Sequence, residues 1–265
     1  MSEFDDRYAA AALEMLNKSS SKDTLKAVLR LMAKHRTRLI QNTLIGTQGV
    51  NVHAGPFAGM IFSDHSTEGC YIPKLLGCYE AELHPFIEDM KTNPYDTIIN
   101  VGSAEGYYAT GFKRLNPATR VIARDTDPAA QAASRAMSEK NGLDLEVGGE
   151  VVWSDFEYLS HGRTLVWCDI EGGERFLLDP IKAPKLCEMD LVIECHGSGK
   201  NRLLPLMISR FEASHDLEVL TQQGHVPKLP PLIDELDHLD QLLVQWEFRS
   251  IPTPWLIARS KHPSM

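Results

Sequence analysis

This sequence of 265 residues lacks long apolar runs, an excess of basic residues and any cluster of tryptophans. These absences argue against a membrane-spanning protein and against a protein that binds nucleic acid. No apolar run reaches the roughly eighteen residues of a membrane-spanning helix, so no membrane span is expected. Acidic residues outnumber basic ones, 36 to 27, which argues against a nucleic-acid-binding face over the whole protein. The four tryptophans are spread along the chain, so no platform for stacking single-stranded nucleic acid is expected. We therefore expect neither membrane nor nucleic-acid partners.

Paired cysteine motifs are also missing. The five cysteines are odd in number and show no C-x-x-C spacing, so reduced thiols are the simplest interpretation. The chain begins MSEFDDRYAA, which is acidic, whereas a secretory signal begins with basic residues. Both observations favour a cytoplasmic protein. No internal repeat or low-complexity tract is present, and the hydrophobic content of 43% is ample for a sizeable core.

The most informative stretch, residues 95–142, has the pattern strand, glycine-containing turn, helix, strand, helix. Thr97–Val101 is a short apolar run typical of a buried parallel strand, and Tyr107–Leu115 can form the helix that follows. A second strand begins at 121–123. Asp127 is then a suitable N-cap, with Pro128 at the first helical position. This alternation predicts an α/β fold with a parallel sheet.

The turn in this stretch predicts nucleotide binding at the carboxyl end of the sheet. Gly102 and Gly106 allow a ligand to approach the backbone closely. Asp125 lies where an acid can accept hydrogen bonds from ribose hydroxyls. The spacing G-x-x-x-G lacks the middle glycine of a dinucleotide fingerprint, and Glu105 would repel a pyrophosphate. A dehydrogenase-like protein is therefore disfavoured, and a tight turn with no ligand is the simplest alternative.

VGSAEGYYATG, VIARDTDP and the later Asp169-Ile170-Glu171-Gly172 together resemble motifs of class I S-adenosylmethionine-dependent methyltransferases, most nearly the FkbM type. The resemblance covers residue 95 to the C-terminus. It implies a Rossmann-like methyltransferase fold, α/β, with a seven-stranded, mostly parallel sheet that includes one antiparallel strand. It also implies S-adenosylmethionine as the cofactor.

The resemblance further implies a set of cofactor-binding residues. The first loop would line the methionine end, an acid after the second strand would hold the ribose, and the loop after the third strand would approach the adenine. With the acid that ends the fourth strand, the set is Gly102, Ser103, Ala104, Glu105, Gly106, Asp125, Glu150 and Asp169.

We divide the chain into an N-terminal, mainly helical extension, 1–93, and a cofactor-binding domain, 94–265. The extension would act as a lid or substrate segment. Helices are expected at 5–17 and 23–39, with a hairpin or irregular region at 44–64.

A further helix at 79–90 would place Tyr79 and Glu82 on one face, toward the first motif. These two residues and Glu171 are our candidates for substrate binding. The alternative is a linking helix in which Tyr79 only packs.

Two later strands deliver the predicted reaction centre. The apolar runs 164–168 and 191–193 end at Asp169 and Glu194, and His196 shares a face with Glu194 because side chains of a strand alternate. His196, Glu194 and Asp169 are the predicted catalytic residues, with His196 favoured as a general base. A divalent cation bound by the three is the second explanation, but no compact metal motif is present and we predict no metal ligands. Purely structural hydrogen bonding is the third.

The C-terminal part is expected to add strands at 217–220 and 255–258, the last of them antiparallel. A helix at 234–243 would expose its four acids, and a proline-rich loop with His225 and Lys228 could meet a substrate.

The sequence as a whole predicts a methyltransferase that acts on a small-molecule acceptor, with O-methylation favoured. Two alternatives stay open. One is another S-adenosylmethionine-using enzyme, a cyclase or an aminocarboxypropyl transferase. The other is a non-catalytic partner protein, which Asn100 favours because many relatives carry an acid there. The sequence also leaves a homodimer open.

Overall fold

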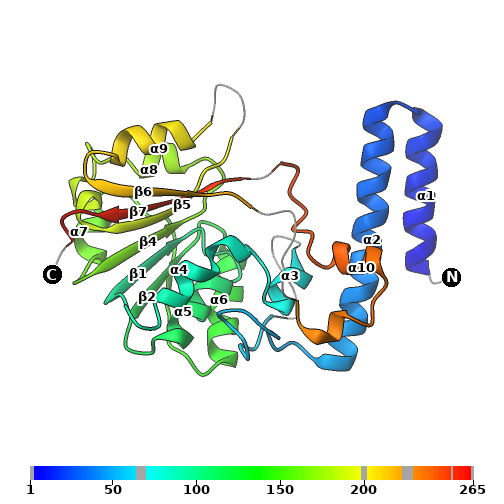
Figure 1. Cartoon of the computed structure of the whole chain (residues 1–265), viewed down its shortest axis with the longest axis horizontal. Helices are drawn as coiled ribbons and strands as arrows, with labels where there is room; N and C mark the ends of the chain where they lie inside the picture. Colours follow the sequence, from blue (N-terminus) through cyan, green and yellow to red (C-terminus); the bar gives the residue numbers. More distant parts are fainter. Residues whose placement is uncertain (1–2, 64–69, 198–201, 223–228, 252, 264–265) are drawn as a thin grey trace.

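A computed structural model describes residues 3–63, 70–197, 202–222, 229–251 and 253–263. Its centre is a seven-stranded sheet in the order β3-β2-β1-β4-β5-β7-β6 (Figure 1). The strands are β1 Thr97–Val101, β2 Arg120–Arg124, β3 Glu146–Gly148, β4 Thr164–Cys168, β5 Asp190–Glu194, β6 His215–Leu220 and β7 Trp255–Ser260.

The first five strands pair in parallel, and β7 runs antiparallel between β5 and β6. This order and this single reversal are those of the Rossmann-like methyltransferase fold, so the predicted fold class is confirmed. All seven strands lie where the sequence pattern places them.

Helices cover both faces of the sheet, which explains why the central strands are apolar at nearly every position. Along β4, Leu165 and Trp167 join one core cluster, and Val166 and Cys168 join the other. The helices of the first face are α5 Tyr107–Leu115 and α6 Pro128–Lys140, and those of the second are α7 Asp155–Leu159, α8 Glu174–Leu177 and α9 Leu204–Phe211 (Figure 1). A short 3₁₀ turn, η2 Pro184–Glu188, precedes β5.

The N-terminal extension begins with a helical hairpin, α1 Glu3–Lys18 and α2 Lys22–Gln48, which stands away from the sheet (Figure 1). The predicted end of the second helix was wrong, because α2 continues through residues expected to be irregular. Ile40 and Leu44 are buried on one face of the helix, so tertiary packing sustains it past residue 39. Beyond the helix, an antiparallel bridge between Asn51 and Ile61 gives the expected hairpin-like region.

The helix predicted at 79–90 begins at residue 81, as a 3₁₀ turn, η1 Ala81–Leu83, which leads directly into α4 His84–Asp89. A separate short helix, α3 Tyr71–Leu76, precedes it. The break falls where Gly77 and Glu80 take positive φ angles of 75° and 47°. Tyr79 therefore precedes the helical turn that contains Glu82, and helical spacing does not bring the two together.

The segment between β6 and β7 returns to the N-terminal helices. It contains η4 Pro231–Ile233 and α10 His238–Leu243, so the helix predicted at 234–243 is present only in its second half. Arg36 of α2 forms an ion pair with Asp240, which is 3% exposed, so the prediction that all four acids of this helix are exposed was wrong. The domain boundary at residue 93 stays a prediction, and α10 contacts α2 across it (Figure 1).

His225 and Lys228, in the proline-rich loop, lie outside the described residues. Among the helices that the structure describes, none combines the length and the apolar character needed to cross a membrane.

Candidate active site

A large cavity, of about 850 Å³, opens at the carboxyl ends of β1, β2 and β4. Gly102, Asp125 and Asp169 follow these three strands directly and all line the cavity. Val151, Trp153 and Leu177 form part of a more apolar wall. A cavity of this size and mixed lining is suited to a nucleoside-sized ligand.

Asp125 has its carboxylate fixed by the neighbouring backbone. One oxygen, Oδ2, accepts a hydrogen bond from the amide of Ala104 at 2.9 Å, and the other accepts from the amide of Asp127 at 2.9 Å. These two bonds join the first loop to the start of α6. Because each carboxylate oxygen has a second lone pair, Asp125 can still accept hydrogen bonds from a ligand in the cavity.

The two glycines of the first loop have different roles from those expected. Gly102 has a φ of 78°, and a Cβ there would lie 1.7 Å from the carbonyl oxygen of Asp169. At Gly106, with a φ of 87°, a Cβ would lie 2.5 Å from the hydroxyl oxygen of Ser134 on α6. Both positions therefore need glycine for close packing within the protein. Gly102 also lines the large cavity, and Gly106 does not.

The rest of this loop divides between two sides. Ala104 lines the large cavity, whereas Ser103 and Glu105 face a much smaller cavity of about 20 Å³ behind it. Glu105 is fully buried and forms an ion pair with Lys74 of α3, with an N–O distance of 2.6 Å. Glu150, from the loop after β3, is on the large cavity as predicted for an adenine contact.

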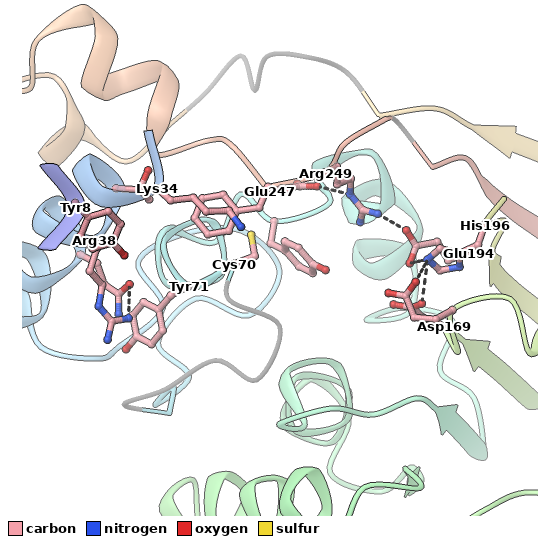
Figure 2. A pocket seen from close by; sticks show the side chains of 15 residues that line it. Tyr8, Lys34, Arg38, Cys70, Tyr71, Asp169, Glu194, His196, Glu247 and Arg249 are labelled. Carbon is pink, nitrogen blue, oxygen red and sulfur yellow. Dashed lines mark hydrogen bonds and ion pairs between the residues drawn. The ribbon is translucent and has the colours of Figure 1, made fainter. Parts of the chain in front are cut away.

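A second cavity, of about 590 Å³, lies between the sheet edge and the N-terminal helices. Asp169, Glu171, Glu194 and His196 line its end nearest the sheet (Figure 2). Asp169 and Glu171 also line the large cavity, so the two cavities share these residues. The predicted catalytic trio is therefore brought together at the junction between them.

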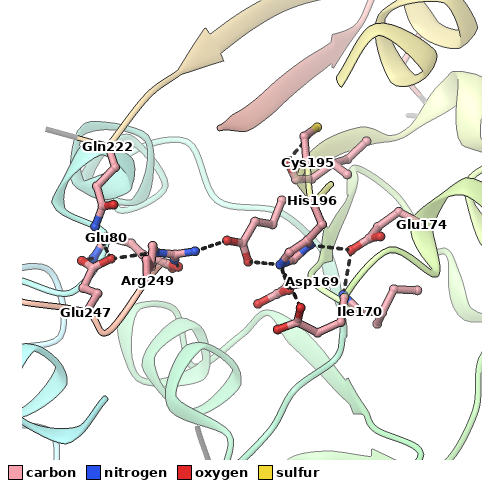
Figure 3. A network of polar contacts seen from close by, with 12 residues as sticks. Glu80, Asp169, Ile170, Glu174, Cys195, His196, Gln222, Glu247 and Arg249 are labelled. Carbon is pink, nitrogen blue, oxygen red and sulfur yellow. Dashed lines mark hydrogen bonds and ion pairs between the residues drawn. The ribbon is translucent and has the colours of Figure 1, made fainter. Parts of the chain in front are cut away.

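His196 is surrounded by four carboxylates. Its Nε2 lies 3.4 Å from Glu171, 3.5 Å from Glu194 and 3.7 Å from Asp169. Its Nδ1 lies 3.4 Å from Glu174, which is fully buried and does not line the second cavity (Figure 3). Nε2 is thus the ring nitrogen that faces the shared carboxylates.

The electrostatics of this group favour proton transfer near neutrality. Burial alone would lower the pKa of His196, but the contact with Glu174 and the charges of Asp169 and Glu171 outweigh it, and the net result is a raised pKa. Burial, with a contribution from Glu80, raises the pKa of Glu194 to about 7, against the opposing charge of Arg249. Both groups can therefore exchange a proton close to physiological pH.

Arg249 connects this centre to the loop that precedes η1. Its guanidinium forms ion pairs with Glu80 and Glu194 and, at 3.0 Å, with Glu247 (Figure 3). Glu80 is fully buried and also accepts a hydrogen bond from the hydroxyl of Tyr108 on α5. Arg249 thus links Glu194, beside His196, to the N-terminal extension.

Two of the three predicted substrate residues, Tyr79 and Glu171, line the second cavity, and Glu82 does not. Glu171 is at the junction of the two cavities, and Tyr79 lines the second one. The ring of Tyr79 also packs 4.8 Å from the ammonium of Lys74, so it combines a packing role with its place in the cavity wall. Glu82 lines neither of the two large cavities and is half-buried.

A metal ion has one candidate ligand set among the described residues. Asp169, Glu171 and His196 each offer one ligand atom, and these atoms lie within 4.8 Å of one another. Two carboxylates and an imidazole suit several divalent cations. Glu171 replaces Glu194 in the set that the sequence suggested.

Sequence reasoning missed two residues of this network, Glu174 beside His196 and Arg249 beside Glu194. Glu174 closes the loop Asp169-Ile170-Glu171-Gly172-Gly173-Glu174, and its position three residues after Glu171 was the available signal. Arg249 lies in an irregular segment before β7, where nothing in the local pattern distinguishes it from a solvent-exposed arginine. Only its pairing with Glu80 and Glu194, which come from distant segments, identifies it.

No family model matches this chain, and no curated protein matches it either. Many solved structures share parts of the fold. A human methyltransferase 10 domain-containing protein is 12% identical, over 86% of this chain and 96% of that one, with a TM-score of 0.48. The other two examples were solved with ligands bound.

An O-methyltransferase from Bacillus cereus, in complex with S-adenosylhomocysteine, is 12% identical over 97% of this chain and 99% of its own, with a TM-score of 0.46. A Streptomyces achromogenes O-methyltransferase involved in tomaymycin synthesis, in complex with S-adenosylmethionine, is 11% identical over 65% and 76%, with a TM-score of 0.44. Likeness at these levels carries no conclusion about activity, which depends on the residues of the site.

We expect Asp125→Ala to raise the dissociation constant for S-adenosylhomocysteine by about tenfold to a hundredfold, because hydrogen bonds to a charged group contribute about 1.5–3 kcal/mol each. Isothermal titration calorimetry measures this directly. Asp144→Ala is the matched control, since Asp144 is exposed and does not line the large cavity. Unchanged affinity in Asp125→Ala would mean that the assignment of the second motif is wrong.

Proposed function

We propose that this protein is an S-adenosylmethionine-dependent methyltransferase that methylates a small molecule, with a hydroxyl as the favoured acceptor. One observation carries the proposal. A nucleoside-sized cavity at the carboxyl ends of the strands meets a second, substrate-sized cavity at Asp169 and Glu171, with His196 beside the junction.

The large cavity fits the proposed cofactor. Asp125 offers a fixed carboxylate for the two ribose hydroxyls, and the backbone of Gly102 and Ala104 borders the space for the amino-acid end. Trp153 and Val151 provide apolar surface beside Glu150, where an adenine ring would pack. When bound there, S-adenosylmethionine supplies an electrophilic methyl group on a sulfonium.

The protein then has two tasks, to align the acceptor and to remove its proton. With its proton on Nδ1, which faces the carboxylate of Glu174 at 3.4 Å, His196 has Nε2 free to accept a proton from the acceptor. Asp169, Glu171 and Glu194 stabilise the imidazolium that forms, because all three lie within 3.7 Å of Nε2. Glu194, with its pKa of about 7, is the second group able to take up that proton.

A metal-assisted reaction is the second candidate, because Asp169, Glu171 and His196 form a compact ligand set. A divalent cation bound there would lower the pKa of the acceptor hydroxyl instead of removing its proton directly. Under our proposal, turnover survives an excess of EDTA. Loss of turnover with EDTA, restored by added Mg²⁺ or Mn²⁺, would favour the metal-assisted reaction.

The cofactor is tested by thermal unfolding with S-adenosylhomocysteine, with NAD and without ligand. A ligand at a hundred times its dissociation constant adds about 2.7 kcal/mol, which for this length of chain raises the melting temperature by roughly 5–10 °C. We expect the rise with S-adenosylhomocysteine alone. A rise only with NAD would overturn the proposal in favour of a dinucleotide-binding protein.

Product analysis separates the remaining S-adenosylmethionine chemistries. Methyl transfer leaves S-adenosylhomocysteine. The alternative reactions, by a cyclase that closes the aminocarboxypropyl group into a ring or by an aminocarboxypropyl transferase, leave methylthioadenosine. We expect S-adenosylhomocysteine in turnover mixtures analysed by mass spectrometry.

A further inference from the structure

The second cavity has two chemically different ends. Three carboxylates, Asp169, Glu171 and Glu194, lie with His196 at the end nearest the sheet. Lys34 and Arg38 of α2 line the opposite end (Figure 2), and Thr37 and Gln41 of the same helix also line the cavity. Tyr71, Tyr79 and Phe248 add aromatic surface to the cavity wall.

Lys34 and Arg38 differ from the neighbouring basic residues of α2. Arg36 forms an ion pair with Asp240, and Arg30 donates hydrogen bonds to the carbonyls of Phe248 and Arg249, so both hold α2 to the segment before β7. Neither Lys34 nor Arg38 forms an ion pair with any carboxylate in the part of the chain that the structure describes. Their contacts are with neutral groups, the ring of Phe248 at 5.1 Å for Lys34 and the amide oxygen of Gln41 at 3.4 Å for Arg38.

Residues four apart lie on the same face of a helix. The side chains of Lys34 and Arg38 therefore line the cavity from the same helix. Glu247 also lines the cavity, but its carboxylate is paired with Arg249, so no carboxylate of the described residues forms an ion pair with either cation. Arg249 does not change this balance, because Glu80, Glu194 and Glu247 already surround it. A guanidinium and an ammonium that line one cavity are each suited to a carboxylate or a phosphoryl group.

We propose that Lys34 and Arg38 form an anion-binding subsite, and that the acceptor is an elongated small molecule with a carboxylate or phosphoryl group at the end opposite its nucleophile. The aromatic side chains of the cavity wall suit an apolar or aromatic middle section. The carboxylates around His196 repel the anionic end, so only one orientation is favourable.

That orientation places the hydroxyl or amine of the acceptor beside His196 and the shared wall of the two cavities. The assignment of the two ends to one acceptor rests on the proposed methyltransferase function. The anion subsite does not, because it depends only on α2 and the cavity.

The subsite is tested by thermal unfolding of the full chain without any cofactor. Inorganic phosphate and succinate are titrated separately, and chloride keeps the ionic strength constant and serves as the reference anion. We expect a saturable rise in melting temperature with at least one of the two anions. A lower apparent dissociation constant for phosphate indicates a phosphoryl ligand, and a lower one for succinate indicates a carboxylate ligand. The double variant Lys34→Gln/Arg38→Gln is expected to raise that constant at least about tenfold.

Lys26→Gln is the matched control, because Lys26 is an exposed base of the same helix that does not line the cavity. It should titrate like the unaltered protein. Lys34 and Arg38 are both exposed, so the double variant is expected to fold, and its melting temperature in chloride checks this. No saturable rise with either anion, or an equal rise in the double variant, would overturn the subsite.

Failure of the subsite and failure of the proposed function are distinguishable. The double variant should bind S-adenosylhomocysteine with unchanged affinity, since neither residue lines the large cavity. With an acceptor in hand, Lys34→Gln should raise KM with little change in kcat, which is the result expected for binding far from the reacting atoms. A loss of kcat at unchanged KM would contradict the proposed orientation.

Discussion

Replacing His196 with alanine is expected to lower turnover by about a hundredfold to ten-thousandfold, the range typical of losing a general base. Affinity for S-adenosylhomocysteine should stay within about twofold, because His196 lines the second cavity and not the large one. Single-turnover rates and calorimetry measure the two quantities separately. Equal activity in the variant would leave His196 with a purely structural role.

The pH dependence of turnover gives the same residue a second test. A general base acts only when unprotonated, so kcat/KM should fall as the pH decreases through the pKa of His196, which its surrounding carboxylates hold above the 6.5 of an ordinary histidine. Glu171→Gln removes one of those charges and should lower the pKa of His196, so the fall in kcat/KM on the acidic side of the pH profile should move to lower pH. Glu171 is 87% exposed, so the substitution should leave the fold intact. A fall at unchanged pH would point to Glu194 as the group that titrates.

Replacing Arg249 with methionine is expected to cause a large loss of stability. Arg249 is the shared partner of Glu80 and Glu194, which are 0% and 2% exposed. Removing one member of a buried ion pair costs roughly 3–5 kcal/mol, which for this length of chain lowers the melting temperature by roughly 6–20 °C. Lys91→Met, which breaks the exposed pair with Glu88, is the control and should cost about 1 kcal/mol or less.

The loss in Arg249→Met should depend on pH in a defined direction. Without Arg249 the pKa of Glu194 rises further above that of the unfolded chain, so the folded state binds protons more tightly than the unfolded state. The stability of the variant therefore falls, relative to the unaltered protein, as the pH rises, and the difference in melting temperature should be larger near about pH 8 than near about pH 5.5. A difference that does not vary with pH would mean that lost packing, and not unpaired charge, causes the destabilisation.

The arrangement of the two cavities suggests why Arg249 is present at all. Glu194 lies beside His196, and a second buried carboxylate, Glu80, lies on the opposite side of Arg249. The guanidinium of Arg249 holds Glu194 next to the imidazole. Arg30 of α2 donates hydrogen bonds to the backbone carbonyls of Phe248 and Arg249, so the segment that carries Arg249 is held against α2. Under the proposed function, Arg249 would be a positioning residue, because it connects Glu194 beside His196 to the segment that Arg30 holds against α2.

Much of the sheet could be predicted from the sequence because its signals are local. Thr97–Val101 and 164–168 are short apolar runs bounded by glycine or acid, and the carboxyl ends of parallel strands meet at one edge wherever they occur in the chain. That rule alone brought Asp125, Asp169 and Glu194 to the same edge. The helix boundaries beyond the sheet were less accurate, because α2 is prolonged by packing that no local pattern encodes.

The sequence by itself determined the fold, the edge of the sheet at which Gly102, Asp125 and Asp169 meet, and the place of His196 beside Glu194. Only the tertiary structure decided the charges around His196 and Glu194, because Glu174 beside the imidazole, Arg249 beside Glu194 and Glu80 beyond Arg249 come from three separate segments. It also decided that Lys34 and Arg38 face a cavity while Arg36 is neutralised by Asp240. A charge in a sequence has no fixed partner, and its role is set by the carboxylates that folding brings within a few ångströms of it.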